Sequence, residues 1–320
     1  MNRVLVIDKP KGMTSHDVVA RVRRQTRIKK VGHAGTLDPA ATGVLVVFVG
    51  KATRLAQFFV DLDKRYHGRV VLGISTDSQD ATGKVESTAD ASKITRKQID
   101  EAFAAFEGDT EQVPPMVSAL KRDGTPLYVL ARRGEVVERK ARPITVSDLS
   151  VVAVELPEVE FDMRCSKGTY VRTIAADIGE ALGCGAHLGQ LSRTAVGPFT
   201  LDMAMQLNEL TRDGMEAGEF GYSMHDALSF MPEIRITDVE EDRIATGGAI
   251  EVDRERLGAN LGTHYRLSVN GLELAAVGKL TEAGARESGS EDQPAGDVLS
   301  GAGEGGPVRI QPVRVFTELD

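Results

Sequence analysis

Apolar residues follow two kinds of pattern along the first two hundred positions. Continuous or alternating apolar runs predict strands at residues 4–7, 44–49, 66–74, 84–87, 144–154, 159–166 and 190–196. Apolar residues at helical spacing predict helices at residues 15–26, 52–61, 95–105, 127–132 and 171–182. Ser15 is the expected N-cap of the first helix, and Thr95 with Gln98 forms a capping box at the third. Because strands and helices mix without a strict βαβ alternation, we predict an α+β fold with a mostly antiparallel central sheet.

A change in pattern at Met231-Pro232 predicts two domains, at residues 1–231 and 232–320. The second is expected to be small and β-rich, because residues 234–236, 237–245 and 247–250 come with several short strands, the last of them at 308–316. Residues 282–306 are rich in Gly, Ser and acidic side chains and have almost no core-forming residues. We therefore expect this stretch to be a disordered insertion.

The composition is that of an ordinary soluble globular protein, with 320 residues, 41% of them hydrophobic and 27% charged. The longest apolar run, residues 44–49, is too short to span a bilayer. The N-terminus reaches Asp8 and Pro10 too soon for a signal peptide, so we expect a cytoplasmic protein. Cys165 and Cys184 are expected to be buried and unbridged, and no Cys/His spacing matches a zinc site.

The net charge of −8 is divided unevenly along the chain. Residues 1–200 carry 29 Lys+Arg and 24 Asp+Glu, a balance of +5, whereas residues 201–320 carry 10 and 23, a balance of −13. Basic side chains concentrate in the first predicted helix and just after it, where Arg23, Arg24 and Lys30 are candidate contacts to RNA phosphates. Phosphate binding depends on the local field of such a patch, so the acidic total does not exclude a nucleic-acid partner.

One carboxylate lies in a turn-rich loop directly ahead of the predicted strand 44–49. Pro39 biases Asp38 toward an extended backbone that presents its side chain. Gly35 and Gly43 allow backbone shapes and close approaches that a side chain would prevent. An acid in a glycine-lined loop on a rigid strand is typical of a catalytic site, although an isolated Asp-Pro is more often part of a surface turn.

The surrounding motifs decide between these readings. Residues 32–45 (GHAGTLDPAATGVL) resemble the catalytic motif of the TruB family of tRNA pseudouridine synthases. The likeness extends through residues 8–17 (DKPKGMTSHD), 63–66 (DKRY), 76–83 (TDSQDATG), 115–121 (PMVSALK), 165–173 (CSKGTYVRT), 183–188 (GCGAHL) and 191–193 (LSR). Blocks in the same order over about two hundred residues identify the chain as similar to this family.

The resemblance implies a pseudouridine synthase fold, a PUA-like C-terminal domain and a reaction at the T-loop uridine, position 55, of tRNA. It implies no cofactor, no metal, no membrane and no obligatory protein partner. By this likeness Asp38 is the nucleophile and Arg172 the residue that pairs with it. Whether the carboxylate attacks C1′, adds to the base or removes a proton to give a glycal is left open by the sequence.

The remaining site residues are also implied by the resemblance. Tyr66 matches a tyrosine that stacks on the flipped uracil, and Tyr170 and Leu191 match the other walls of that pocket. His33 matches a histidine that enters the T-loop, and Asp80 matches an acid in the polar network of the site. The chain departs from the family at Ser192, where an arginine is frequent, so one phosphate contact is expected to be missing.

Three other functions share features with this sequence. Residues 50–53 (GKAT) resemble the end of a P-loop, but the upstream glycine and the Ser or Thr after the lysine are both missing, which excludes an NTPase. A guide-RNA-dependent pseudouridine synthase shares the Asp loop, and the acidic C-terminal part argues against it. A tRNA-binding or tRNA-folding module remains compatible with the sequence, and its role could coexist with catalysis.

Overall fold

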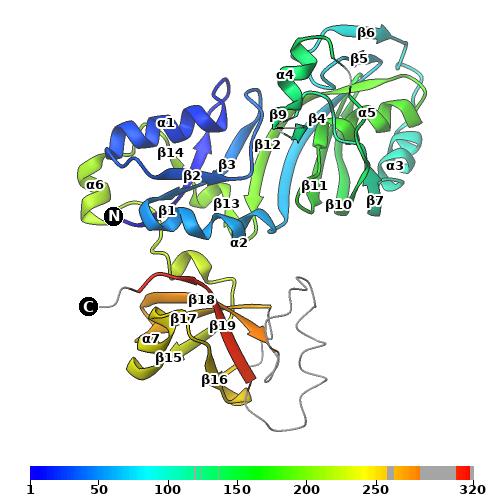
Figure 1. The fold of residues 1–320 in the computed structure, drawn as a ribbon. Coiled ribbons are helices and arrows are strands. Elements are labelled where there is room, and N and C mark those ends of the chain that lie inside the picture. Colours follow the sequence, from blue (N-terminus) through cyan, green and yellow to red (C-terminus); the bar gives the residue numbers. More distant parts are fainter. Residues whose placement is uncertain (119, 123, 136, 258–262, 282–307, 318–320) are drawn as a thin grey trace.

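In this computed structural model, the structure describes residues 1–118, 120–122, 124–135, 137–257, 263–281 and 308–317. The expected insertion at 282–306 lies outside the described residues. A large sheet with helices on its faces occupies the upper part of the molecule, and a separate smaller sheet lies below it (Figure 1).

The large sheet has ten strands in the order β14-β1-β3-β12-β4-β11-β10-β7, with β2 beside β3 and β13 beside β12. Its strands are β1 (Arg3–Lys9), β2 (Val31–Ala34), β3 (Thr42–Val49), β4 (Lys64–Leu72), β7 (Gly108–Gln112), β10 (Arg142–Glu155), β11 (Glu158–Cys165), β12 (Ala186–Val196), β13 (Phe199–Thr200) and β14 (Met205–Gln206). The β1–β14 and β3–β12 pairings are parallel and the other seven are antiparallel, so the sheet is mixed. The prediction of a mostly antiparallel sheet did not include the two parallel pairings, of which the β3–β12 pairing is permitted by the long crossover between these strands.

The helices and short strands lie around both sheets. The α-helices are α1 (Ser15–Thr26), α2 (Ala56–Val60), α3 (Arg96–Ala104), α4 (Leu127–Arg132), α5 (Val171–Ala181), α6 (Arg212–Ala217) and α7 (Asp238–Ala245). The 3₁₀ helices are η1 (Gly50–Leu55), η2 (Leu201–Met203), η3 (Asp226–Leu228) and η4 (Arg254–Leu257). Two small hairpins pair β5 (Ile74–Thr76) with β6 (Val85–Thr88) and β8 (Lys121–Arg122) with β9 (Thr125–Pro126).

Three details of the predicted elements are corrected. Thr14, not Ser15, caps α1, because its hydroxyl accepts from the Asp17 amide and the Asp17 carboxylate accepts in return. The helix expected at 52–61 begins as the 3₁₀ turn η1 and becomes α-helical only at Ala56. The strand expected at 66–74 breaks at Gly73, whose φ is +81°, so β5 and not β4 pairs with β6.

The continuous apolar run of β3 is explained by burial on both faces of the sheet. Leu45, Val47 and Val49 pack with the inward valines of α1, whereas Val46 and Phe48 pack on the side of α2. In contrast, β4 alternates strictly between buried and more exposed side chains, because α3 and α5 cover only one of its faces. The open face of β4, β11 and β12 is therefore polar.

The large sheet separates into two halves beside β12, and the site lies at this separation. β12 pairs with β4 along its whole length, with two irregularities, but it meets β3 only where Ser192 pairs with Thr42 and Arg193 with Gly43. Toward its N-terminal end, Leu188 of β12 forms a bridge with Asp80. Between these two contacts, residues 189–191 have no strand partner on that edge among the described residues. The loop after β2 and the loop after β5 stand on the two sides of this interval.

The smaller sheet has the order β15-β17-β18-β19-β16 and its own core. Its strands are β15 (Glu233–Ile236), β16 (Ile250–Val252), β17 (His264–Val269), β18 (Glu273–Thr281) and β19 (Val308–Val315). Leu274, Val277 and Phe316 from this part join the core beneath α2, and the Arg54 guanidinium lies 5.0 Å from the Phe316 ring centre. The C-terminal sheet is thus packed directly against the larger one.

Phe59 of α2 is central to this shared core. Its ring lies 4.9 Å from Phe48, 5.5 Å from Phe199 and 5.4 Å from Phe230. Phe59→Ala is expected to lower the free energy of unfolding by about 3–5 kcal/mol, because it leaves a cavity among these rings. Val60→Ala, at an exposed neighbouring position, should change it by less than about 0.5 kcal/mol. Chemical denaturation of both variants checks this, and equal midpoints would contradict it.

Candidate active site

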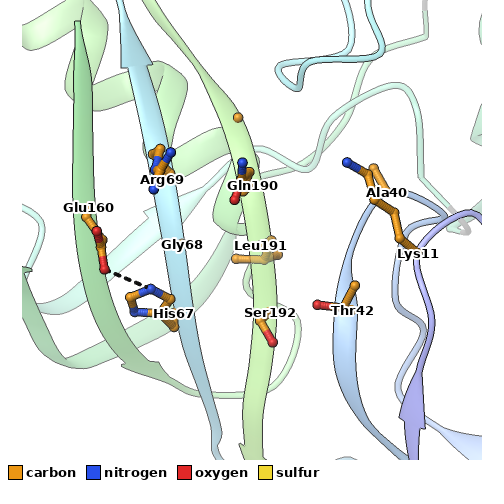
Figure 2. Close-up of a pocket in the computed structure, with 11 residues that line it drawn as sticks. Lys11, Ala40, Thr42, His67, Gly68, Arg69, Glu160, Gln190, Leu191 and Ser192 are labelled. Carbon is orange, nitrogen blue, oxygen red and sulfur yellow. Dashed lines mark ion pairs between the residues drawn. The ribbon is translucent and has the colours of Figure 1, made fainter. Parts of the chain in front are cut away.

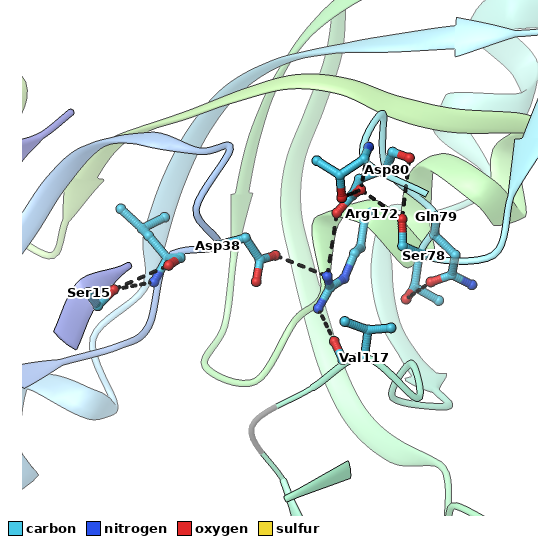
Figure 3. Close-up of polar contacts among 10 residues, drawn as sticks. Ser15, Asp38, Ser78, Gln79, Asp80, Val117 and Arg172 are labelled. Carbon is cyan, nitrogen blue, oxygen red and sulfur yellow. Dashed lines mark hydrogen bonds and ion pairs between the residues drawn. The ribbon is translucent and has the colours of Figure 1, made fainter. Parts of the chain in front are cut away.

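Asp38 lies in a loop that is tied down on several sides. The Ser15 hydroxyl, at the start of α1, accepts from the Leu37 amide at 2.9 Å and donates to the Leu37 carbonyl at 3.2 Å. The Gly12 amide donates to the Pro39 carbonyl at 2.7 Å, and the Ala41 amide closes a turn onto the Asp38 carbonyl at 3.1 Å. Ser15 therefore serves the loop and not the helix cap. The Asp38 side chain extends from this fixed turn toward Arg172 (Figure 3).

Arg172 brings together three segments that are distant in sequence. Its side chain is only 5% exposed, and its Nη1 lies 3.2 Å from an Asp38 carboxylate oxygen and 3.6 Å from one of Asp80. Nη2 donates to the Val117 carbonyl at 2.6 Å (Figure 3). A guanidinium held between two acids and a carbonyl has a fixed orientation. The structure thus assembles Asp38, Arg172 and Asp80 as the sequence predicted.

Gln112, which was not identified from the sequence, fixes the start of α5, the helix that carries Arg172. Buried Gln112 accepts from the Tyr170 amide at 2.8 Å and donates to the Tyr170 carbonyl at 3.1 Å. No side chain caps this helix, and Gln112 instead holds the backbone amide and carbonyl of Tyr170, the residue at the N-cap position. The Tyr170 ring lies 5.7 Å from the Arg172 guanidinium carbon and covers one of its faces.

Asp80 is held in the loop after β5. One of its oxygens accepts from the Ser78 hydroxyl at 2.7 Å, the Thr82 amide at 2.8 Å and the Thr82 hydroxyl at 2.6 Å. Gln79 adopts φ +64°, rare for a residue with a side chain, and accepts from the Thr173 hydroxyl at 2.7 Å. This loop is therefore locked onto α5, the same helix that carries Arg172.

The two acids respond oppositely to their surroundings. Desolvation by the protein around it raises the pKa of Asp38 and Asp80 adds to the rise, whereas Arg172 opposes it, although the side chain is still 46% exposed on one side. Burial alone would raise the pKa of Asp80, but the hydrogen bonds from Thr82 and Ser78, helped by Arg172, lower it. The surroundings of Asp80 thus favour its charged form, whereas burial opposes the charged form of Asp38.

Three more of the predicted site residues lie on strands, Tyr66 on β4, Leu191 on β12 and His33 on β2. Tyr66 is buried in the core cluster that contains Leu37 and Ala41, on either side of Asp38, and burial raises the pKa of its hydroxyl. Leu191 packs partly against that cluster from the unpartnered edge of β12. His33 sits on β2, edge-on to His16 at 5.4 Å. Burial and nearby cationic groups lower the pKa of His33 to about 4, so its imidazole is neutral at pH 7.

Ser192 opens onto a pocket of about 200 Å³ on the polar face of the sheet (Figure 2). Lys11 and Thr42 approach it from one side, and Gln190 and His67 from the other. His67 is itself held at 3.1 Å from Glu160 and at 2.9 Å from Asp162. The small Ser192 side chain leaves this space open at the position where the family frequently has an arginine.

The predicted phosphate contacts lie at the C-terminal end of α1 and just after it. Arg23 and Arg24 are in the last turn of α1, about 12 Å along the helix axis from Ser15. The Arg23 guanidinium donates to the Val31 carbonyl at 2.7 Å, so this residue also supports β2. Arg24 and Lys30 are exposed. These side chains could contact RNA only beyond the immediate pocket.

Two buried bases beneath the site were not identified as site residues from sequence. The Lys9 ammonium donates to the carbonyls of Met13 at 2.7 Å, Pro10 at 3.0 Å and Pro39 at 3.4 Å. The Arg193 guanidinium, 1% exposed, donates to two other carbonyls beside the loop. Both residues occur in segments that carried the family resemblance, but their residue types gave no sign that they would be buried.

Among the described residues, no group of three or more His, Cys, Asp or Glu side chains could hold a metal ion, and no helix is long and apolar enough to cross a membrane. The fold is that of solved pseudouridine synthases. The structure aligns over 99% of its length with 85% of a chain of a Cbf5-Nop10-Gar1 complex, with a TM-score of 0.71 and 26% identity. A chain of an archaeal box H/ACA sRNP Nop10-Cbf5 complex aligns with a TM-score of 0.68 over 99% of this chain and 87% of that one, at 24% identity.

The sequence comparisons are more specific than the fold. Residues 23–171 match the N-terminal domain model of the TruB family pseudouridylate synthases, and residues 172–219 match the tRNA pseudouridylate synthase B C-terminal domain. A protein named tRNA pseudouridine synthase B from Geobacter sulfurreducens is 45% identical over 88% of this chain and 94% of its own length. Its namesake from Syntrophotalea carbinolica is 48% identical over 77% of this chain and 81% of its own. The chain belongs to the TruB family of pseudouridylate synthases.

Lys9 gives the site a measurable pH signature, because burial lowers its pKa from 10.5 to about 8. Below pH 8 both folded and unfolded chains are protonated, and the folded state carries the full cost of the buried charge. Between about pH 8 and 10.5 the folded state loses its proton first, so the free energy of unfolding rises with pH. Relative to Lys9→Met, the native protein should gain about 2 kcal/mol between about pH 7.5 and 9.5.

Urea unfolding at a series of pH values measures this difference. Lys11→Met is the matched control, since Lys11 is exposed two residues away, and it should follow the native protein. Parallel pH curves for the native protein and Lys9→Met would show that Lys9 is not buried as a charged group.

Proposed function

We propose that this protein isomerises the T-loop uridine at position 55 of tRNA to pseudouridine, with Asp38 as the nucleophile. The observation that carries the proposal is the Asp38 carboxylate held 3.2 Å from the buried Arg172 guanidinium at the division of the sheet. The curated relatives are named for tRNA pseudouridine synthesis, which supports tRNA as the substrate.

The geometry suits a base that is turned out of its RNA. Tyr66 of β4 and Leu191 of β12 lie on the same face of adjacent strands. Tyr66 pairs with Arg193, and Leu191 pairs with Gly68. A flipped uracil between them would stack on the Tyr66 ring with its sugar toward Asp38. The unpartnered edge of β12 offers peptide groups, and a uracil edge carries both a donor and acceptors that such groups can satisfy.

The charged state of Asp38 is required by each route open to the reaction. Attack on C1′, addition to the base and removal of a proton from the sugar all start from a carboxylate. Arg172 favours that form, while the raised pKa of Asp38 keeps the carboxylate basic enough to react. Neutral His33 can enter the RNA loop without adding a charge there.

The remaining parts are assigned supporting roles. Arg23, Arg24 and Lys30 would contact phosphates of the T arm. Residues 1–231 would form the catalytic domain and residues 232–320 a PUA-like domain, for which the separate five-stranded sheet and its own core give support. The protein would act in the cytoplasm, on bare tRNA and without an obligatory protein partner.

Pseudouridine mapping of a tRNA transcript incubated with the purified protein tests the function. Native protein alone should modify position 55, whereas Asp38→Asn should give no product and bind tRNA within about tenfold of native affinity, because binding is distributed over many phosphates. Turnover only with an added guide RNA would favour the guide-dependent function. Binding without turnover by the native protein would favour a tRNA-folding module, and near-native turnover by Asp38→Asn would exclude Asp38 as the nucleophile.

The salt dependence of binding tests the position of the RNA. Arg24→Glu with Lys30→Glu should weaken tRNA binding and reduce the slope of log affinity against log salt by about one unit for each lost contact. Lys97→Glu is the control, because Lys97 lies on α3 beside the other half of the sheet. Fluorescence anisotropy over a range of salt concentrations measures the slopes, and an unchanged slope in the double variant would place the RNA on another face.

A further inference from the structure

Arg193 is the largest fully buried side chain in the described part of the chain, and it lies at the base of the Asp38 loop. Its Nε donates to the Val44 carbonyl at 2.7 Å and its Nη2 to the Gly35 carbonyl at 3.1 Å. Gly35 directly follows β2, and Val44 lies near the start of β3. One guanidinium therefore joins the two ends of the loop that carries Asp38.

The hydrogen bonds from the Arg193 side chain take over where the backbone pairing of β2 and β3 ends. The β2–β3 ladder ends where Ala34 pairs with Val46, so the next carbonyls toward the loop have no partner from the facing strand. The Arg193 guanidinium lies in this place, where the two strands move apart, and donates to one carbonyl from each of them. Its backbone is fixed there as well, since a side chain on Gly43 would come within 2.3 Å of the Arg193 carbonyl oxygen.

Arg193 also faces the pocket wall. It pairs directly with Tyr66 across β12 and β4, so both side chains lie on the same side of the sheet. None of the ion pairs among the described residues includes Arg193. A buried charge without an acidic partner is costly, and a neutral side chain would fill the same space at a lower cost. Packing alone does not account for an arginine at this position.

We infer that Arg193 is a positioning residue that sets the separation between the Asp38 carboxylate and the Tyr66 ring by clamping both ends of the catalytic loop. Arginine is suited to this because its planar fork reaches two carbonyls at once, whereas a lysine ammonium at the same place can reach only one of them well. The inference rests on the proposed function for its catalytic consequence, but the clamp itself can be tested without RNA.

The test compares Arg193→Met and Arg193→Lys with the control Arg164→Met, whose arginine pairs with Asp63 on the exposed side of β11. Single-turnover rates at saturating protein, tRNA affinity and amide hydrogen exchange are measured for each. Arg193→Met should lose about 100-fold in rate, because small displacements of reacting groups cost this much, with tRNA affinity within threefold. Exchange should rise in residues 35–44 and stay unchanged in β18. Arg193→Lys should fall between Arg193→Met and the native protein, and the control should match the native protein.

A chemical rescue separates positioning from general stability. In Arg193→Ala, added guanidinium ion at low millimolar concentration should restore the rate at least tenfold and slow the exchange of residues 35–44. An unchanged rate, an equal rise of exchange in β18, or a loss explained by the unfolded fraction would overturn the inference. If Arg193→Met and Arg193→Ala do not fold, Arg193→Lys decides it by the same criteria. If the native protein modifies no RNA, the proposed function fails, and the exchange data still decide whether Arg193 clamps the loop.

Discussion

The buried guanidinium of Arg172 is the contact on which the arrangement of the site depends. It is reached by Asp38 from the β2–β3 loop, by Asp80 from the β5–β6 loop and by the Val117 carbonyl ahead of β8. Removing such a charge from water is expensive unless acidic or carbonyl oxygens lie close to it. Each of these segments therefore stabilises the others through one side chain, and the division beside β12 leaves the space in which they meet.

Much of the fold could be predicted from the sequence where one pattern dominated. The capping box at Thr95 gave the start of α3, and the apolar run of β3 gave a buried strand, because each depends on neighbouring residues alone. The predictions failed where distant contacts decide. The Gly73 break, the parallel β3–β12 pairing and the use of the Ser15 hydroxyl by Leu37 all depend on segments that meet only after folding.

The site residues also divide into those that local motifs reveal and those whose role depends on contacts between distant segments. Asp38, Arg172 and Asp80 could be named because their motifs resemble a family, and the structure brings them into contact. Lys9, Gln112 and Arg193 were not named as site residues. Lysine, glutamine and arginine are usually exposed, and nothing in the local sequence shows that these three are almost fully buried. Lys9 and Arg193 are buried against the Asp38 loop, and Gln112 is buried against the start of α5.

Because the Asp38 loop is held at both ends, the protein and the RNA contribute differently to the proposed reaction. Ser15, Gly12 and Lys9 hold the Asp38 loop from outside, and Arg193 holds it from beneath, so little of the catalytic geometry is left to form on binding. The conformational change must then occur in the RNA, whose uridine leaves its stack at a cost of a few kcal/mol. In the proposed function, stacking on Tyr66, worth about 1–3 kcal/mol, would offset part of that cost. Phosphate contacts distributed over the tRNA would supply the rest, so the residues that bind tRNA would differ from those that react with it.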